Sequence, residues 1–173
     1  MSIKNLNLEI AQFAMKSVLD SVKEMESCVD GENKREKGKV GKPKEDVKKD
    51  TKKNSPYKSL IKKIPVMVQK NGLINTLVFL FSKQKGKEYK LALNHFINWS
   101  IINPKTKDME SFKKIKLEED QFGEDQFEKD KYKEYIKAVY GLSSKEYRIL
   151  TGEMINLFVW LKRFADGVIE GDD

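Results

Sequence analysis

Apolar residues recur three or four positions apart over most of this chain, which is the spacing of one face of an α-helix. Residues 6–27 show the pattern first, and Asn5 or Asn7 can cap the start of the helix they predict. The residues that form its stripe are Ile10, Ala14, Val18, Val22 and Met25, broadened by Ala11, Met15 and Leu19.

A second helix is expected to begin at Ser55-Pro56, where a capping residue is followed by a first-turn proline. Pro65 lies inside it and removes a backbone donor, so we expect a bend or break there. Asn71-Gly72 is typical of a helix end with a left-handed cap. The third predicted helix, over about 73–84, is apolar on most sides, which indicates a buried, central position.

The second half of the chain predicts further helices over about 87–102, 125–140 and up to residue 168. Ser143 and Glu146 form a capping box at the start of the last one. Residues 104–124 are polar and partly acidic, and are interpreted as a long loop. No segment alternates with period two, so the predicted fold class is all-α: a compact bundle of about five to six helices without a sheet.

Composition changes abruptly between the first two helices. Residues 31–54 hold ten Lys or Arg and five Asp or Glu, with only Val40 and Val47 as aliphatic residues. Such a segment buries too little apolar surface to offset the entropy of ordering it. We therefore expect one domain: an N-terminal helix (1–27), a lysine-rich disordered linker (28–55) and a main bundle (56–170). The linker is either a polybasic arm for phosphates or a tolerated insertion.

The charge balance favours an anionic partner. Lys and Arg number 34 against 27 Asp and Glu, giving a net charge of +7 and a pI near 9.2. Nucleic acid or an acidic membrane face would suit such a chain, although a lysine-rich inert surface is the alternative. Only Arg35, Arg148 and Arg163 are arginines. Because lysine is a mobile point charge, phosphate contact is favoured over base reading.

Residue types that carry catalysis are scarce. Cys28 and His95 are single, so no disulfide, cysteine metal cluster or plausible zinc site is expected, and His95 is interpreted as a surface or partly buried residue. Glycine-rich phosphate-binding loops are absent. The sequence thus predicts no enzyme, no cofactor and no metal. Neither a signal peptide nor an apolar run of about 20 residues is visible, so a cytoplasmic location is expected.

Basic residues next to aromatic ones are the remaining functional signal. Lys62, Lys63 and Lys70 flank the second helix, and Lys162 and Arg163 form a basic edge on the last. The free amides after Gly72 could also hold a phosphate. Trp160 and Phe164 are more typical of core than of a base-stacking platform.

Two blocks of the sequence resemble the small helical subunit of the type III-B CRISPR effector, the Cmr (RAMP module) complex. The first block contains Lys63, Pro65, Met67, Asn71-Gly72-Leu73, Thr76-Leu77 and Phe79-Leu80; the second contains Tyr147-Arg148, Thr151, Glu153 and Trp160-Leu-Lys-Arg-Phe-Ala165. The resemblance covers about residues 6–27 and 57–170. The segment 31–54 is longer than the family's expected link, and the loop 104–124 has no clear counterpart.

The resemblance implies a helical subunit without catalytic activity of its own. Several copies are expected to stack as a filament beside the backbone and large subunits. The backbone subunits hold the crRNA and cleave the target single-stranded RNA. A membrane partner is not implied. The predicted nucleic-acid-binding residues are Lys62, Lys63, Lys70, Asn71, Arg148, Lys162 and Arg163. The alternative is a helical protein–protein adaptor, in the same or another assembly, without direct RNA contact.

Overall fold

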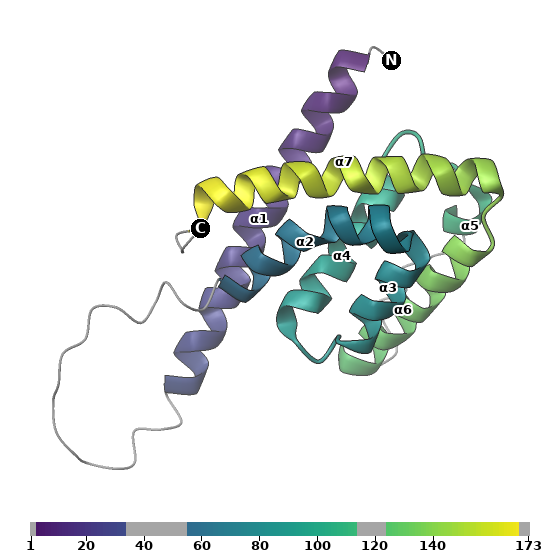
Figure 1. The fold of residues 1–173 in the computed structure, drawn as a ribbon. Helices are drawn as coiled ribbons and strands as arrows, with labels where there is room; N and C mark the ends of the chain where they lie inside the picture. The colour runs from purple at the N-terminus through teal and green to yellow at the C-terminus, as the bar shows by residue number, and fades with distance from the viewer. Residues whose placement is uncertain (1–2, 34–54, 114–123, 170–173) are drawn as a thin grey trace, which may run out of the picture.

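The computed structural model describes residues 3–33, 55–113 and 124–169, all organised around α-helices (Figure 1). Within these ranges there are seven helices and no strand, which confirms the all-α prediction and adds one short helix to the expected number. The helices are α1 (Ile3–Asn33), α2 (Ser55–Asn71), α3 (Leu73–Ser82), α4 (Lys87–Ile102), α5 (Glu110–Lys113), α6 (Glu124–Tyr140) and α7 (Ser144–Val168).

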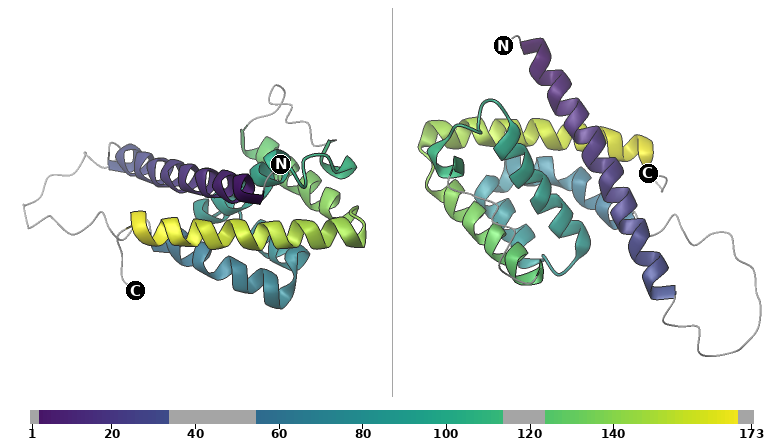
Figure 2. Two further views of the ribbon diagram at one scale, coloured as in Figure 1. Left: turned by 90° about the horizontal axis from the view of Figure 1, so that it is seen from above. Right: turned by 180° about the vertical axis from the view of Figure 1, so that it is seen from behind.

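Helix α7 spans the molecule and organises the bundle. It packs mainly against α2 on one flank and α1 on the other, while α3, α4 and α6 complete the body (Figures 1 and 2). Its inner face supplies much of the core, and the Phe158 ring lies 4.4 Å from the Phe96 ring of α4. The fully buried residues of α7 are Leu150, Met154, Leu157, Phe158, Leu161 and Ala165.

Local signals predicted several helix ends well. Helix α4 has the predicted bounds 87–102, and the capping box at Ser143 and Glu146 is present, with the Ser143 side chain accepting from the Glu146 amide. The same contact holds the pKa of Glu146 below its ordinary value, because the carboxylate accepts hydrogen bonds from the Ser143 hydroxyl and amide. Short-range chemistry therefore determines where α7 begins.

Two helices differ from what the sequence predicted. A bend or break was expected at Pro65, and helix α2 continues through this residue without a break; Pro65 is buried, so packing outweighs the loss of one backbone hydrogen bond. Helix α3 is not buried all round: Leu73, Leu77 and Leu80 are buried, but Val78 is 43% and Phe79 39% exposed. Its apolar surface is therefore shared between the core and the outside.

Two boundaries also differ from prediction. Helix α1 continues to Asn33, past the expected end at residue 27, while residues 34–54 of the predicted linker lie outside the described residues. The expected loop 104–124 contains the one-turn helix α5, because Met109 and Phe112 turn inward and are buried. The acidic residues 118–123 of that loop also lie outside the described part.

His95 is buried, contrary to the expectation of a surface or partly exposed residue. Its Nε2 lies 2.9 Å from the Tyr57 hydroxyl and 3.3 Å from Ser21 Oγ, so the ring joins α4 to α2 and α1. Burial lowers the pKa of His95 to about 4 and raises that of Tyr57. All three residues are buried, so these contacts lie inside the bundle. Among the described residues, no helix is long and apolar enough to cross a membrane.

Candidate nucleic-acid interface

The predicted binding residues all lie on α2 or α7, which pack side by side in opposite directions. At one end, Lys58 Nζ donates to the Ile169 carbonyl at 3.0 Å, and Lys62 Nζ lies 2.8 Å from Asp166 Oδ1. At the other end, the Ile74 amide just beyond α2 donates to the Tyr147 hydroxyl at 3.3 Å. These contacts define an α2–α7 edge, made of the solvent-facing residues of both helices.

The α2–α7 edge brings the seven predicted residues into two groups. Lys62, Lys63, Lys162 and Arg163 lie toward the end marked by Asp166, while Lys70, Asn71 and Arg148 lie toward the end marked by Tyr147. Fifteen residues of α7 separate Arg148 from Arg163, which places the two groups about 20 Å apart. An extended anionic chain, rather than a compact anion, matches that separation.

Lys62 is the least available of the seven. Its ion pair with Asp166 offsets its charge, and only 30% of its side chain is exposed. Lys63, Lys70, Asn71, Arg148, Lys162 and Arg163 are exposed. Within the described residues, no ion pair or side-chain hydrogen bond involves Lys63, Lys70, Arg148 or Lys162. These four cations are therefore exposed to water and have no charged partner in the described part of the chain.

Arg163 has a partner of another kind. Its guanidinium carbon lies 5.3 Å from the centre of the Trp160 ring, and Trp160 stacks on Phe164 with ring centres 5.9 Å apart. Both rings are half-buried against the core, which agrees with the interpretation of these aromatics as packing residues. The cation–π contact orders the Arg163 side chain while leaving its N–H groups free to donate outward.

At the start of α3, one of the backbone amides that was expected to bind a phosphate already has a hydrogen-bond partner. The Tyr147 hydroxyl occupies the position in front of Ile74 N, so this amide already has an acceptor. Gly72 has φ 82° and ψ 161°, an extended backbone conformation open to glycine alone, and not the left-handed helical cap that was predicted. The Tyr147 hydroxyl thus caps the start of α3. The sequence did not predict this role, because the contact joins residues far apart in the chain.

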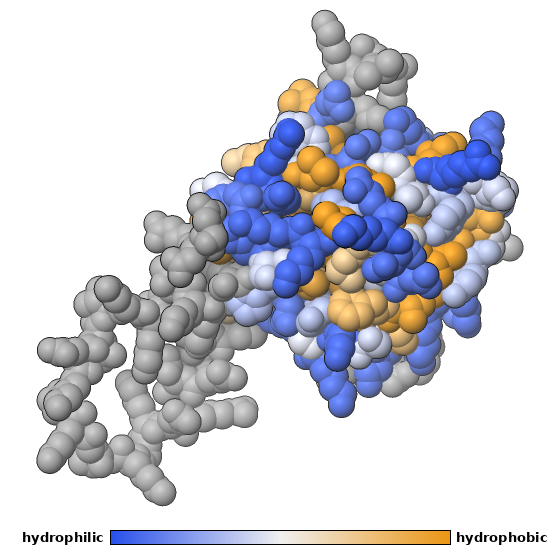
Figure 3. All heavy atoms as spheres, in the orientation of Figure 1, coloured by the Kyte–Doolittle hydropathy of each residue, from blue (hydrophilic) through white to orange (hydrophobic). Residues whose placement is uncertain are grey.

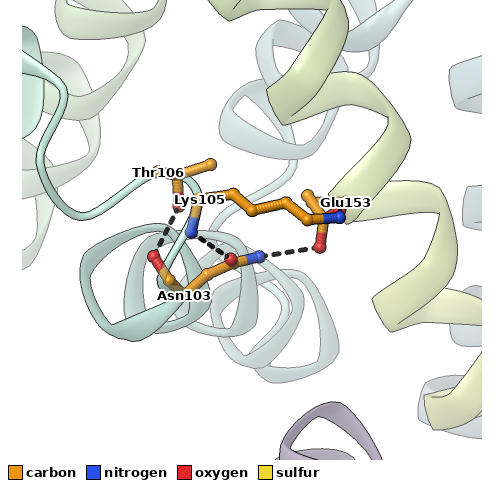
Figure 4. A network of polar contacts seen from close by, with 4 residues as sticks. All are labelled: Asn103, Lys105, Thr106 and Glu153. Carbon is orange, nitrogen blue, oxygen red and sulfur yellow. Dashed lines mark hydrogen bonds and ion pairs between the residues drawn. The ribbon is translucent and has the colours of Figure 1, made fainter. Parts of the chain in front are cut away.

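Glu153 belongs to a separate polar network at the C-terminal end of α4 (Figure 4). Its carboxylate accepts from Asn103 Nδ2 at 2.9 Å and from Lys105 Nζ at 2.6 Å. Asn103 and Thr106 are fully buried, and Glu153 is only 5% exposed. The network links the loop after α4 to α7. Both carboxylate oxygens of Glu153 therefore already accept hydrogen bonds from within the protein. No cluster of three metal-ligating side chains occurs among the described residues.

In the orientation of Figure 1, hydrophilic side chains dominate the surface over α7 and α2, with hydrophobic residues exposed between them (Figure 3). One of the exposed apolar residues of α2 is Val66, at 48%. The arrangement can hold a polyanion electrostatically and also contact protein.

A family model described as CRISPR-associated protein (Cas_Cmr5) matches residues 33–168. The chain belongs to the Cas_Cmr5 family. It is therefore a small subunit of the type III-B CRISPR effector, the Cmr complex, and membership implies association with other Cmr subunits. No curated protein and no solved structure matches the chain. The match includes α2–α7 but begins at the last residue of α1, so the expected likeness of residues 6–27 is not part of it.

Proposed function

We propose that this Cmr small subunit has no catalytic role, stacks with copies of itself inside the effector and binds target or guide RNA through backbone phosphates. The observation that carries the RNA part is the set of exposed cations on the α2–α7 edge. Burial and ion pairing do not account for Lys63, Lys70, Arg148 or Lys162 among the described residues. Phosphate binding does account for them, since it needs cations that are accessible and not already paired.

The proposed contact is independent of base sequence. Lysines predominate, and they neutralise phosphates without the paired donors that read a base edge. Arg163, held over Trp160, is the exception, because its planar donors can bind a phosphate with two hydrogen bonds. The cytoplasm is the proposed site of action, because that is where guide RNA and invading transcripts meet.

The salt dependence of RNA binding tests direct contact. If each copy neutralises about four phosphates, the logarithm of the affinity for single-stranded RNA falls with the logarithm of salt concentration at a slope near −3. A titration with oligonucleotides of unrelated sequence should return the same slope for each. Binding that is indifferent to salt, or confined to one sequence, contradicts phosphate contact.

A pair of charge-reversal variants locates the contact. Lys162→Glu with Arg163→Glu changes the net charge by −4 on the α2–α7 edge, and we expect a loss of affinity of at least about tenfold with a shallower slope. Lys133→Glu with Lys137→Glu makes the same change on α6, where both lysines pair with acids of the preceding turn. Equal losses in both variants would mean that net charge, not this edge, drives binding.

The adaptor alternative has its own supporting observation, the exposed Val66, Val78 and Phe79 on α2 and α3. In that case the chain enters the Cmr complex through protein contacts only. Co-purification that survives nuclease treatment, combined with no RNA crosslink to this subunit, would support the adaptor and exclude direct RNA contact.

A further inference from the structure

One carboxylate lies among the cations of the α2–α7 edge, where the C-terminal end of α7 meets α2 (Figure 1). Asp166 Oδ1 is 2.8 Å from Lys62 Nζ and 3.8 Å from Lys58 Nζ, both on α2. Lys162 and Arg163 precede Asp166 on α7 by four and three residues, the spacing of neighbours on one side of a helix. We call these five residues the Asp166 cluster. Its four positive charges lie around a single negative one.

Acidic residues are scarce on the two helices that form the edge. Helix α2 contains no Asp or Glu, and α7 contains Glu146, Glu153 and Asp166. Glu146 belongs to the capping box, and Glu153 accepts hydrogen bonds in the buried network beside α4. Asp166 is therefore the acidic residue of α7 whose charge meets the cations of the edge.

The stability of α7 does not explain an acidic residue at this position. Asp166 lies in the last turn of α7, where the negative end of the helix dipole disfavours a carboxylate. Aspartate is also a weak helix former. Its side chain is 37% exposed, so it does not fill the core. The carboxylate is held instead by the two lysines of α2.

The two lysines of α2 form an anion site. Only 8% of the Lys58 side chain is exposed, and its Nζ donates to the Ile169 carbonyl at 3.0 Å, just beyond the end of α7. A buried cation is costly unless an anion lies near it, and the Asp166 carboxylate supplies that anion. Lys62, 30% exposed, contacts the same oxygen. One buried and one half-buried lysine thus hold an anion, which the protein itself provides.

We infer that Asp166 is an internal competitor for phosphate: its carboxylate occupies the place of one RNA backbone phosphate at Lys58 and Lys62, and it is displaced when RNA binds. A carboxylate and a phosphodiester each carry one negative charge and accept hydrogen bonds from ammonium groups, so the exchange keeps the local charge. This inference rests on the RNA contact of the proposed function and concerns its strength.

Competition by Asp166 lowers the affinity of each copy for RNA. The site is available only in the fraction of molecules in which the carboxylate is released, and the apparent affinity falls by that fraction. A single copy then binds weakly, whereas a stack of copies still binds strongly because its members hold one strand together. The Asp166 cluster thus favours binding by the assembled subunit over binding by isolated copies.

Removal of the carboxylate should strengthen RNA binding. We expect Asp166→Asn to bind single-stranded RNA at least about fivefold more tightly than wild type, with a salt slope steeper by about 0.7, since one more phosphate is neutralised per copy. Asp130→Asn is the matched control, because Asp130 on α6 is an exposed acid 3.1 Å from Lys133 and the change in net charge is the same. An unchanged or weaker affinity in Asp166→Asn, or an equal gain in both variants, overturns the inference.

A double-mutant cycle with Lys62 separates competition from general charge repulsion. In a Lys62→Gln background, Asp166→Asn should increase the affinity for RNA by less than about twofold, because the carboxylate then no longer masks this lysine. The same gain with and without Lys62 would mean that Asp166 acts only as a nearby negative charge, and would exclude competition.

A measurement on the wild-type chain covers the case in which a variant does not fold, which circular dichroism detects. The NMR signal of the Asp166 side-chain carboxyl carbon should shift when single-stranded RNA is added, because the carboxylate leaves its lysine partners. The corresponding signal of Asp130 should stay in place. An Asp166 carboxyl signal that does not move while RNA binds overturns the inference.

Tripolyphosphate distinguishes a failure of this inference from a failure of the proposed function. This anion should raise the midpoint of thermal unfolding more for Asp166→Asn than for wild type, because its site is no longer filled. If it does so while neither protein binds RNA, the RNA contact is refuted and the competition for phosphate remains. RNA binding with a slope near −3 that Asp166→Asn leaves unchanged refutes only the role of Asp166.

Discussion

The buried polar side chains on and after α4 and the exposed cations of the α2–α7 edge differ in whether they have hydrogen-bond or ion-pair partners within the protein. His95, Ser100 and Asn103 on and after α4 each have a defined hydrogen-bond partner on another helix. Lys63, Lys70 and Lys162 have none among the described residues. The three buried polar groups are paired because an unpaired buried group is costly, although Asn94 Oδ1 and Trp99 Nε1 of α4 are buried without a hydrogen-bond partner among the described residues. Those that remain in water are available for a ligand.

This comparison predicts that changes around α4 affect stability and changes on the edge affect binding. The largest expected effect concerns His95. Its pKa of about 4 in the folded protein lies below the 6.5 of an unfolded chain, so the unfolded state binds the proton more readily. The stability contributed by neutral His95 is present above about pH 6.5 and is lost as the pH falls toward 4, by up to about 3 kcal/mol.

Urea denaturation at several pH values between 7 and 4 measures this loss. His95→Gln has no proton to bind, so the slope of its unfolding free energy with pH should be smaller by up to about 1.4 kcal/mol per pH unit. The carboxylates titrate in both proteins and cancel in the comparison. Identical slopes in the two proteins would show that His95 does not titrate differently on folding.

Glu153 should have the next largest effect. Glu153→Ala leaves the buried Asn103 amide without its acceptor, and we expect a loss of about 2 kcal/mol in the free energy of unfolding. Glu134→Ala is the matched control: Glu134 is also 2.6 Å from a lysine, Lys137, but it is exposed. Its loss should stay below about 0.5 kcal/mol. Similar losses would mean that the ion pair, and not burial, sets the cost.

Two glycines should respond in opposite directions. Gly72→Ala forces a β-carbon into a backbone conformation that only glycine adopts, at a cost of about 1–3 kcal/mol, although the nearest atom, the Tyr147 hydroxyl oxygen, leaves room at 3.7 Å. Gly152→Ala on α7 has open space and should stabilise the protein by about 0.5–1 kcal/mol. Thermal unfolding compares the two, and a stable Gly72→Ala would refute the backbone assignment.

The smallest effect on stability is expected where binding should suffer most. Lys162→Glu with Arg163→Glu removes only the contact of Arg163 with Trp160, so unfolding should change by less than about 1 kcal/mol. Circular dichroism during urea titration measures it. A large loss would show that these residues serve the fold and would remove the distinction between the two regions.

Helix existence, and several helix ends, could be predicted from the sequence because their causes are local. Apolar spacing marked α4, and the pairing of Ser143 with Glu146 marked the start of α7. The predictions failed where contacts between residues far apart in the sequence determine the local structure. Pro65 stays within α2 because the core packs around it, and the partners of His95 stand 38 and 74 residues away. Met109 and Phe112 did signal α5, since they are apolar residues three apart in a polar stretch.

The candidate site could be predicted only in part. Exposed basic residues near helix ends were visible in the sequence, but their partners were not. The ion pair of Lys62 with Asp166 and the closure of the α3 amide by Tyr147 depend on how α2 and α7 pack. The exposure of Leu8, Met15 and Leu19 was hidden for the same reason, since the pattern alone assigned Met15 and Leu19 to the apolar stripe of the first helix.

Crosslinking of photoreactive target RNA to the assembled Cmr complex tests the central claim most directly, because every copy is then in its working position. The α2–α7 edge should carry the crosslinked peptides, at Lys63, Lys70, Arg148 or the Lys162-Arg163 pair. Peptides from α6, or no crosslink to this subunit while its neighbours react, would contradict it.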